Sequence, residues 1–251
     1  MWGGMFYFGS NTKSNLGSAA HNEILQEAKD LAITYPDVQF FLLPSIPFFR
    51  ELKVDSLGSS FWIGNQSLSS TSEQDVTGEV QASTLKALGS DLVMIAHAER
   101  RRLFDGDAEI AAQLKAAESE DLRVLFCIGE SVQAHDFTAL RKLLKAQLEP
   151  IAHHSLDLII AYEPVFSIGV GGVPADPQYV ETVLKIIKEE LSELNMAKTP
   201  LLYGGSVNVH NAAPYGALKG CDGLFVGRSA WSAEGYKQVF HAGYEAFKKR
   251  L

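Results

Sequence analysis

The run Leu158-Ile159-Ile160-Ala161-Tyr162, followed by Glu163-Pro164, decides the fold. It is apolar on consecutive residues, which is typical of a parallel strand buried on both faces. The run at 40–43 (Phe-Phe-Leu-Leu) has the same character. Short runs of the β type recur along the chain, and the predicted strands span 5–8, 38–43, 61–63, 92–95, 124–128, 158–162, 201–203 and 224–226.

Amphipathic stretches separate these strands. Apolar residues from Val180 to Leu194 recur with the 3.6-residue period of a helix, which Asp176 opens as its N-cap and Pro177 in its first turn. We find no low-complexity segment, Pro/Ser-rich linker or abrupt change of composition. Eight strand–helix units in 251 residues predict an α/β fold of one domain, residues 1–251, built as a single (β/α)8 barrel. An open, doubly wound sheet is the alternative.

The composition argues against several classes of partner. With 46% apolar and 21% charged residues, the chain has the balance of a soluble globular protein. No apolar run reaches the roughly 18–20 residues that cross a bilayer. A net charge of −8 argues against a nucleic-acid partner, which needs a basic face. Cys127 and Cys221 lie in apolar surroundings, and the start of the chain lacks a signal-peptide pattern. We therefore expect a cytoplasmic protein with reduced thiols and no membrane or nucleic-acid partner.

Polar and glycine-rich segments follow six of the predicted strands: 9–13, 97–101, 129–130, 162–172, 203–207 and 227–229. In a barrel, the loops at the carboxyl ends of the strands build the active site. A single histidine in such a place is more often structural than catalytic. Six segments at the ends of different strands are much harder to attribute to packing, so we expect an active site at this end of the barrel.

Two glycine-containing turns, 204–206 and 227–229, predict a phosphate site. Their backbone N–H groups are free of side-chain obstruction, and a short helix after the last strand would point its N-terminus at the anion. The segment 169–172 (Gly-Val-Gly-Gly) lacks the third glycine of a dinucleotide-binding motif, so we interpret it as a mobile lid whose Gly169 offers a further N–H group. Tight turns without a ligand are the alternative for either turn in isolation.

Three residues at strand ends fit one reaction. Glu163 is placed to act as a base, Lys13 supplies a positive charge, and a neutral His97 can donate a hydrogen bond to a carbonyl oxygen. Together they indicate abstraction of a proton from the carbon next to a carbonyl group.

Five motifs resemble the triosephosphate isomerase family along the whole chain. They are 161–165 (Ala-Tyr-Glu-Pro-Val), 203–208 (Tyr-Gly-Gly-Ser-Val-Asn), 97–101 (His-Ala-Glu-Arg-Arg), 127–130 (Cys-Ile-Gly-Glu) and 222–223 (Asp-Gly). The resemblance implies an aldose–ketose isomerase of a small sugar phosphate that converts glyceraldehyde 3-phosphate to dihydroxyacetone phosphate through an enediolate, as in glycolysis and gluconeogenesis. It implies no metal and no organic cofactor.

The resemblance also implies a role for each matching residue. Glu163 would move a proton between the two carbons of the enediolate, while neutral His97 polarises the carbonyl group and relays the hydroxyl proton. Lys13, oriented by Glu99, would stabilise the negative charge, and Asn11 would support the oxygens. The phosphate would accept N–H groups from Gly169, Ser206, Gly227 and Arg228.

The segment 66–80 resembles the dimer loop of the same family. It carries Thr77-Gly78-Glu79, and Thr77 would reach the region of Asn11 and Lys13 in a second copy. An ordinary surface loop is the alternative, but 15 residues is long for one. We therefore expect a homodimer formed through residues 66–80.

The chain departs from the family pattern around the substrate. Thr12 stands where the family has Trp, and Ala98 where it has Ser. Phe225 and Arg228 stand where the family's last strand has Leu and Gly, and the lid ends in 172–174 (Gly-Val-Pro) instead of Lys-Thr-Ala.

These departures leave alternatives to a triosephosphate isomerase open. The run at 227–231 (Gly-Arg-Ser-Ala-Trp) is similar to isomerases of a four-carbon ketose phosphate of the erythrulose 1-phosphate type. A catalytically silent phosphosugar-binding protein is a second alternative. Another phosphosugar barrel, such as a decarboxylase or an epimerase, is a third.

Overall fold

The computed structural model describes residues 4–169 and 171–251. Eight parallel strands form one sheet in the order β3-β2-β1-β8-β7-β6-β5-β4. The strands are β1 (Phe6–Asn11), β2 (Val38–Leu43), β3 (Trp62–Ile63), β4 (Val93–Ile95), β5 (Val124–Ile128), β6 (Leu158–Tyr162), β7 (Leu201–Tyr203) and β8 (Gly223–Val226).

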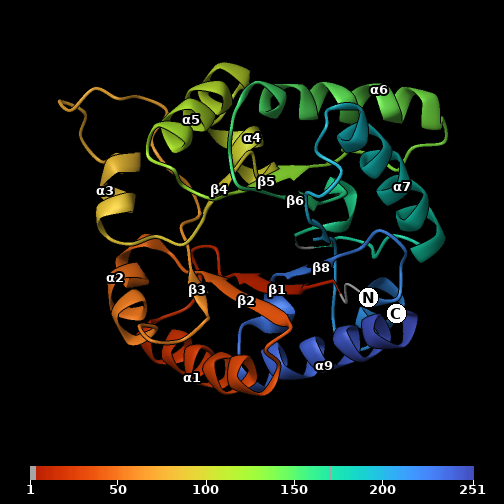
Figure 1. The fold of residues 1–251 in the computed structure, drawn as a ribbon, viewed down its shortest axis with the longest axis horizontal. Helices are drawn as coiled ribbons and strands as arrows, with labels where there is room; N and C mark the ends of the chain where they lie inside the picture. Colours follow the sequence, from red (N-terminus) through yellow and green to blue (C-terminus); the bar gives the residue numbers. More distant parts are fainter. Residues whose placement is uncertain (1–3, 170) are drawn as a thin grey trace.

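The sheet closes into a barrel between its two outer strands. Asn65, which follows β3, pairs in parallel with Val93 of β4. The Asn65 amide donates to the Leu92 carbonyl at 2.9 Å, and the Met94 amide donates to the Asn65 carbonyl at 2.8 Å. Figure 1 shows the strands at the centre and the helices around them. The predicted (β/α)8 barrel is confirmed, and the alternative of an open sheet is wrong.

Helices cover the outside of the barrel. They are α1 (Ser18–Thr34), α2 (Ile46–Asp55), α3 (Ala82–Ala87), α4 (Ala98–Leu103), α5 (Asp107–Ser119), α6 (Phe137–Leu148), α7 (Pro177–Glu193), α8 (Ala212–Gly216) and α9 (Ala233–Arg250), with short 3₁₀ turns η1 (Glu149–His153), η2 (Val165–Ser167) and η3 (Arg228–Ala230). The helix α7 begins as predicted, because the Asp176 carboxylate accepts the amides of Gln178 and Tyr179 at 2.8 and 3.2 Å.

Alternate residues of each strand face two separate cores. In β6, Ile160 and Tyr162 pack outward against the helices, whereas Ile159 and Ala161 point into the barrel. This double burial is the reason that the strand is apolar on consecutive residues. Inside the barrel, the rings of Phe41 and Phe225 are stacked with centroids 5.8 Å apart.

The strand β1 is longer than the sequence predicts. The prediction was 5–8, but the strand continues to Asn11, whose register partner in β2 is Leu43. Gly9 is required at this depth, because a Cβ there would lie 2.2 Å from the Phe41 ring. Asn11 is thus anchored in the sheet, and Lys13 is the second residue beyond it.

Two further sequence expectations can be compared with the structure. Cys127 and Cys221 are buried free thiols, as expected. None of the helices in the described residues has the length and apolar character of a membrane span.

Candidate active site

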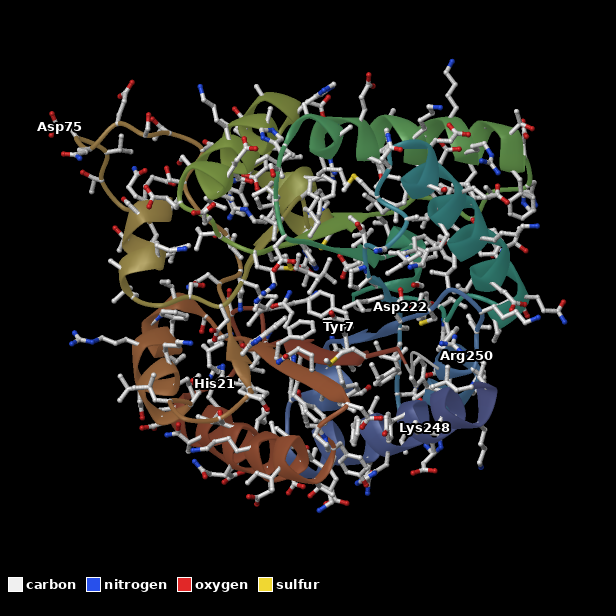
Figure 2. The ribbon with its side chains drawn as sticks, in the orientation of Figure 1. Tyr7, His21, Asp75, Asp222, Lys248 and Arg250 are labelled. Atoms are coloured by element: carbon white, nitrogen blue, oxygen red, sulfur yellow. The ribbon has the colours of Figure 1, made fainter. Side chains whose placement is uncertain are left out.

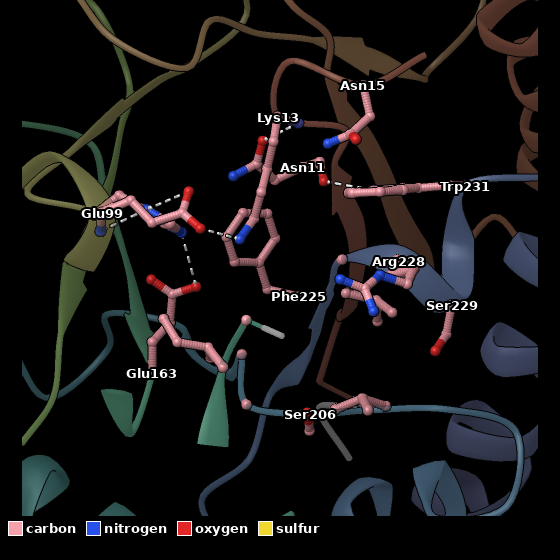
Figure 3. A pocket seen from close by; sticks show the side chains of 18 residues that line it. Asn11, Lys13, Asn15, Glu99, Glu163, Ser206, Phe225, Arg228, Ser229 and Trp231 are labelled. Atoms are coloured by element: carbon pink, nitrogen blue, oxygen red, sulfur yellow. Dashed lines mark hydrogen bonds and ion pairs between the residues drawn. The ribbon is translucent and has the colours of Figure 1, made fainter. Parts of the chain in front are cut away.

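A cavity of about 460 Å³ opens at the carboxyl ends of the strands (Figure 3). Its wall includes all nine residues predicted for the site: Asn11, Lys13, His97, Glu99, Glu163, Gly169, Ser206, Gly227 and Arg228. They come from the ends of β1, β4, β6, β7 and β8 and from the predicted lid. Val170 of that lid lies outside the described residues.

Lys13 reaches the cavity from a constrained loop. Its backbone is left-handed, with φ at 52°, and its amide donates to the Asn11 Oδ1 at 2.8 Å. Its ammonium group forms an ion pair with the Glu99 carboxylate. A left-handed lysine is uncommon and needs support from its surroundings. The loop therefore holds the charge in one place at a conformational cost.

His97 is the N-cap of α4 and is held by the first turn of that helix. The Glu99 amide donates to its Nδ1 at 3.2 Å, so we assign the ring hydrogen to Nε2. Nε2 lies 3.5 Å from Oε1 of Glu163. Burial alone would lower the pKa of His97, but the carboxylates of Glu163 and Glu99 together raise it above its ordinary value. These carboxylates pull the ring toward its charged form, whereas the helix N-terminus opposes a positive charge. The amide donated to Nδ1 leaves no hydrogen on that nitrogen, so the geometry is that of a neutral imidazole with its N–H group at Nε2.

Glu163 is buried beside the cavity at the end of β6. Its side chain is 5% exposed, and its Oε2 has no hydrogen-bond partner within the described residues. Glycines make room for it, because a Cβ on Gly204 would lie 2.8 Å from its Cγ and a Cβ on Gly129 would lie 2.0 Å from its carbonyl oxygen. A buried carboxylate oxygen without a partner is costly. It is therefore available to a bound molecule.

The opposite wall carries the residues of the predicted phosphate site. Figure 3 shows Glu99 and Glu163 on one side of the cavity and Arg228 on the other. The guanidinium of Arg228 forms no ion pair with any described residue. Gly169 has a left-handed backbone, with φ at 84°. The amides of Gly169 and Ser206 donate no hydrogen bond to any residue within 4–169 or 171–251.

Sequence reasoning missed one aromatic residue of this wall. Trp231, which follows η3, lines the cavity, and its indole Nε1 donates to the Asn11 carbonyl at 2.9 Å. The sequence distinguishes the run at 227–231 only by its resemblance to other isomerases. A signal was present, because a large aromatic four residues after a glycine-ended barrel strand falls at the active-site end.

One predicted strand-end segment does not reach this cavity. Glu130 is buried behind it and accepts the hydroxyls of Tyr162 and Tyr179 at 2.8 and 2.7 Å. Burial raises the pKa of Glu130, and these two hydrogen bonds partly oppose that rise. The segment 129–130 therefore supports the strands and α7 near the lid. Among the residues that the structure describes, no cluster of three His, Cys, Asp or Glu side chains has the arrangement of a metal site.

Comparisons with known proteins agree with this arrangement. The family model described as triosephosphate isomerase matches residues 6–243. An L-erythrulose-1-phosphate isomerase of Rhizobium etli is 37% identical over 81% of this chain and 79% of its own. A protein of the same name from Brucella abortus is 32% identical over 93% of this chain and 94% of its own. A probable triosephosphate isomerase 2 of Listeria monocytogenes is 32% identical over 92% of this chain and 94% of its own.

Proposed function

Because the chain belongs to the triosephosphate isomerase family, we propose that it isomerises a small phosphorylated ketose through an enediolate, with Glu163 as the base. One observation carries the proposal. The carboxylate of Glu163 is buried beside the cavity, its Oε2 has no partner among the described residues, and a histidine N–H and a lysine lie around the same space. Such a carboxylate can take a proton from a bound molecule.

The remaining groups suit the charge that develops. When Glu163 removes the proton, the electron pair moves to the carbonyl oxygen of the substrate. His97 can donate its Nε2–H to that oxygen, and the Lys13 ammonium offsets the negative charge. Glu163 then returns the proton to the neighbouring carbon, while His97 moves the hydroxyl proton from one oxygen to the other. The step is a transfer of protons only, and residues of this chain carry them.

The phosphate end of the substrate would lie against Gly169, Ser206, Gly227 and Arg228. The Arg228 guanidinium is a cation without a carboxylate partner in the described part of the chain, and Glu163 lies across the cavity from it. A phosphate dianion is a suitable ligand for such a group. This separation of charges would orient the substrate with its phosphate away from the base.

We infer a four-carbon ketose phosphate as the substrate, in preference to a triose phosphate. The names of the Rhizobium and Brucella relatives support this choice, as does the run at 227–231, which is similar to isomerases of this type. In a ketose phosphorylated on carbon 1, the carbonyl is on carbon 2, and carbon 3 offers the proton on the side away from the phosphate. The phosphate-to-base distance therefore matches that of dihydroxyacetone phosphate, and one hydroxymethyl group is added beside Glu163.

The triose phosphate is the second candidate. The name of the Listeria relative favours it, and Lys13, His97, Glu99 and Glu163 would serve either substrate. The same chemistry thus applies to both, and only the fit of the wall beside Glu163 distinguishes them.

The deciding experiment compares kcat/KM on L-erythrulose 1-phosphate and dihydroxyacetone phosphate with one enzyme preparation. We expect at least a tenfold preference for the four-carbon substrate. The opposite ratio would make the protein a triosephosphate isomerase. Binding of both compounds without turnover would identify a phosphosugar-binding protein. Release of carbon dioxide or a requirement for an added metal would point to another class of barrel enzyme.

We also propose that the protein is a homodimer. The segment 66–80 projects from the barrel between β3 and α3, with Asp75 near its tip (Figures 1 and 2). A hollow of about 740 Å³ lies beside Lys13 and is lined by residues 14–17, 45–48 and the base of the same segment. The Thr77 side chain of one copy would enter this hollow of a second copy. Sedimentation at micromolar concentration should give the mass of a dimer, and a monomer would contradict the proposal.

A further inference from the structure

A buried polar pair lies behind Lys13. Thr12 and His21 are both fully buried, and the Thr12 Oγ1 lies 2.9 Å from the His21 Nε2. The other ring nitrogen of His21, Nδ1, lies 2.9 Å from the Gly17 carbonyl. A carbonyl only accepts, so Nδ1 carries the ring hydrogen and Nε2 accepts the Thr12 hydroxyl. The Leu43 carbonyl is a more distant acceptor for that hydroxyl, at 3.4 Å.

This pair anchors a segment whose backbone conformation is unfavourable by itself. Lys13 has a left-handed backbone, which residues other than glycine adopt at a cost. The Thr12 amide donates to the Leu43 carbonyl at 3.1 Å, and the Gln66 side chain donates to the Lys13 carbonyl at 2.8 Å. These bonds tie the loop to β2 and to the segment after β3. His21 lies on α1 (Figure 2), so its bond to Thr12 ties the loop to that helix.

We propose that His21, acting through the Thr12 hydroxyl, is a positioning residue for Lys13. The pair fixes the peptide between Thr12 and Lys13, which directs the lysine side chain toward Glu99 and the cavity. Loss of the hydrogen bond should let the Lys13 backbone relax from its left-handed conformation, which moves the ammonium group away from the developing charge. The functional part of this inference rests on the proposed role of Lys13 in catalysis.

Packing is the competing explanation for His21. Its ring lies against Phe48 with centroids 4.9 Å apart, so removal of the ring would disturb the contact between α1 and α2. The variants must therefore separate ring shape from hydrogen bonding. Valine at position 12 keeps the shape of threonine and removes the hydroxyl, whereas serine keeps the hydroxyl. Glutamine at position 21 can accept from Thr12 and donate to Gly17, whereas leucine can do neither.

The test uses two matched pairs in the full-length protein, Thr12→Val with Thr12→Ser and His21→Leu with His21→Gln. We expect Thr12→Val and His21→Leu to lower kcat about tenfold while KM changes less than threefold, because the phosphate site is untouched. Thr12→Ser and His21→Gln should keep kcat within about threefold of the wild type. Equal losses in both members of a pair, or no loss in Thr12→Val, would overturn the inference and leave a packing role.

A second readout does not depend on turnover. The Lys13 amide donates to the Asn11 Oδ1, so hydrogen exchange of this amide reports whether the loop is held. Thr12→Val and His21→Leu should accelerate its exchange at least tenfold, and Thr12→Ser and His21→Gln should not. Unchanged exchange in the first two variants would refute the positioning role even if no substrate were turned over. If the wild-type protein lacked activity and the four variants still showed these differences in exchange, only the proposed function would be refuted.

Discussion

The two sides of the cavity differ in how their side chains are held. On the side that we propose for proton transfer, formed by Lys13, His97, Glu99 and Glu163, the side chains contact one another. The lysine pairs with Glu99, the Glu99 amide donates to His97, and His97 faces Glu163. On the side that we propose for the phosphate, formed by Gly169, Ser206, Gly227 and Arg228, backbone groups dominate, and the one charged side chain is unpaired within the described residues.

Under the proposed function, this difference separates the reaction from the choice of substrate. A change to one residue of the proton-transfer side displaces the others, so its chemistry tolerates little variation. The phosphate side presents main-chain groups that most side chains leave intact. Arg228 can therefore differ from the usual family residue without loss of the base, the carbonyl donor or the lysine. We infer that this chain keeps the family's reaction and adjusts its substrate.

The largest effect should follow from Glu163→Gln. Glutamine keeps the shape but cannot take a proton, so kcat should fall roughly 10²–10⁴-fold on the better substrate. Steady-state kinetics measures this loss, and titration with inorganic phosphate should give the wild-type affinity. A fall in phosphate affinity equal to the fall in kcat would mean that the two sides are not separate.

Lys13→Met should produce the next largest loss. The enediolate would then develop without its nearby cation, and kcat should fall about 10²–10³-fold. Lys185→Met, at a lysine whose side chain is 77% exposed on α7, is the matched control and should retain wild-type kinetics. Wild-type kcat in Lys13→Met would remove this lysine from the mechanism.

Arg228→Met tests the phosphate side by itself. Loss of a charge-assisted contact to phosphate should raise KM about tenfold, with kcat within about threefold. Arg228→Lys should show a smaller increase in KM because it keeps the charge. The exposed Arg50 on α2 provides the control, as Arg50→Met. A loss confined to kcat would assign Arg228 to the chemistry instead.

Phe225→Leu should change substrate preference modestly. The Phe225 ring lies beside Gly204, where a Cβ would lie 3.4 Å from the Phe225 Cδ1 and 2.8 Å from the Glu163 Cγ. Leucine leaves more room beside Glu163 than the phenyl ring, so the kcat/KM ratio should shift about 3–10-fold toward L-erythrulose 1-phosphate, since a few methylene groups in an apolar wall discriminate weakly. A ratio unchanged within error would show that the ring does not sense substrate length.

The smallest effect concerns stability and pH. Burial lowers the pKa of His21 below the ordinary 6.5, against the opposing effects of the Gly17 carbonyl and Glu51. As the pH falls below 6.5, the unfolded chain binds this proton more readily than the folded chain, so the free energy of unfolding decreases down to the folded pKa. Urea titrations at several pH values should show a smaller decrease for His21→Gln than for the wild type. An equal decrease of the free energy of unfolding in both proteins would contradict this account of His21.

The sequence predicts strands well where both faces are buried. The bounds of β2, β5, β6 and β7 match their predicted ranges, because consecutive apolar residues mark these strands directly. The end of β1 does not, since Gly9 and Ser10 have weak strand propensity and only pairing with neighbouring strands makes them extended. Pairing with strands that are distant in the sequence cannot be predicted from the local residue pattern.

The site shows the same division. All nine residues predicted from strand-end motifs line one cavity, because a barrel gathers the carboxyl ends of its strands. The bond from Trp231 to Asn11 joins residues 220 positions apart, and the bond from Thr12 to His21 depends on the path of a loop. Neither contact has a local pattern, so neither could be predicted before the fold was known.

Solvent exchange tests the central claim most directly. The wild-type protein is incubated with L-erythrulose 1-phosphate or dihydroxyacetone phosphate in D₂O, and the substrate is followed by proton NMR. We predict that one deuterium enters at the carbon next to the carbonyl on the side away from the phosphate, and that Glu163→Gln abolishes this incorporation. Absence of deuterium with the wild-type protein, or an equal rate with Glu163→Gln, would contradict proton abstraction by Glu163.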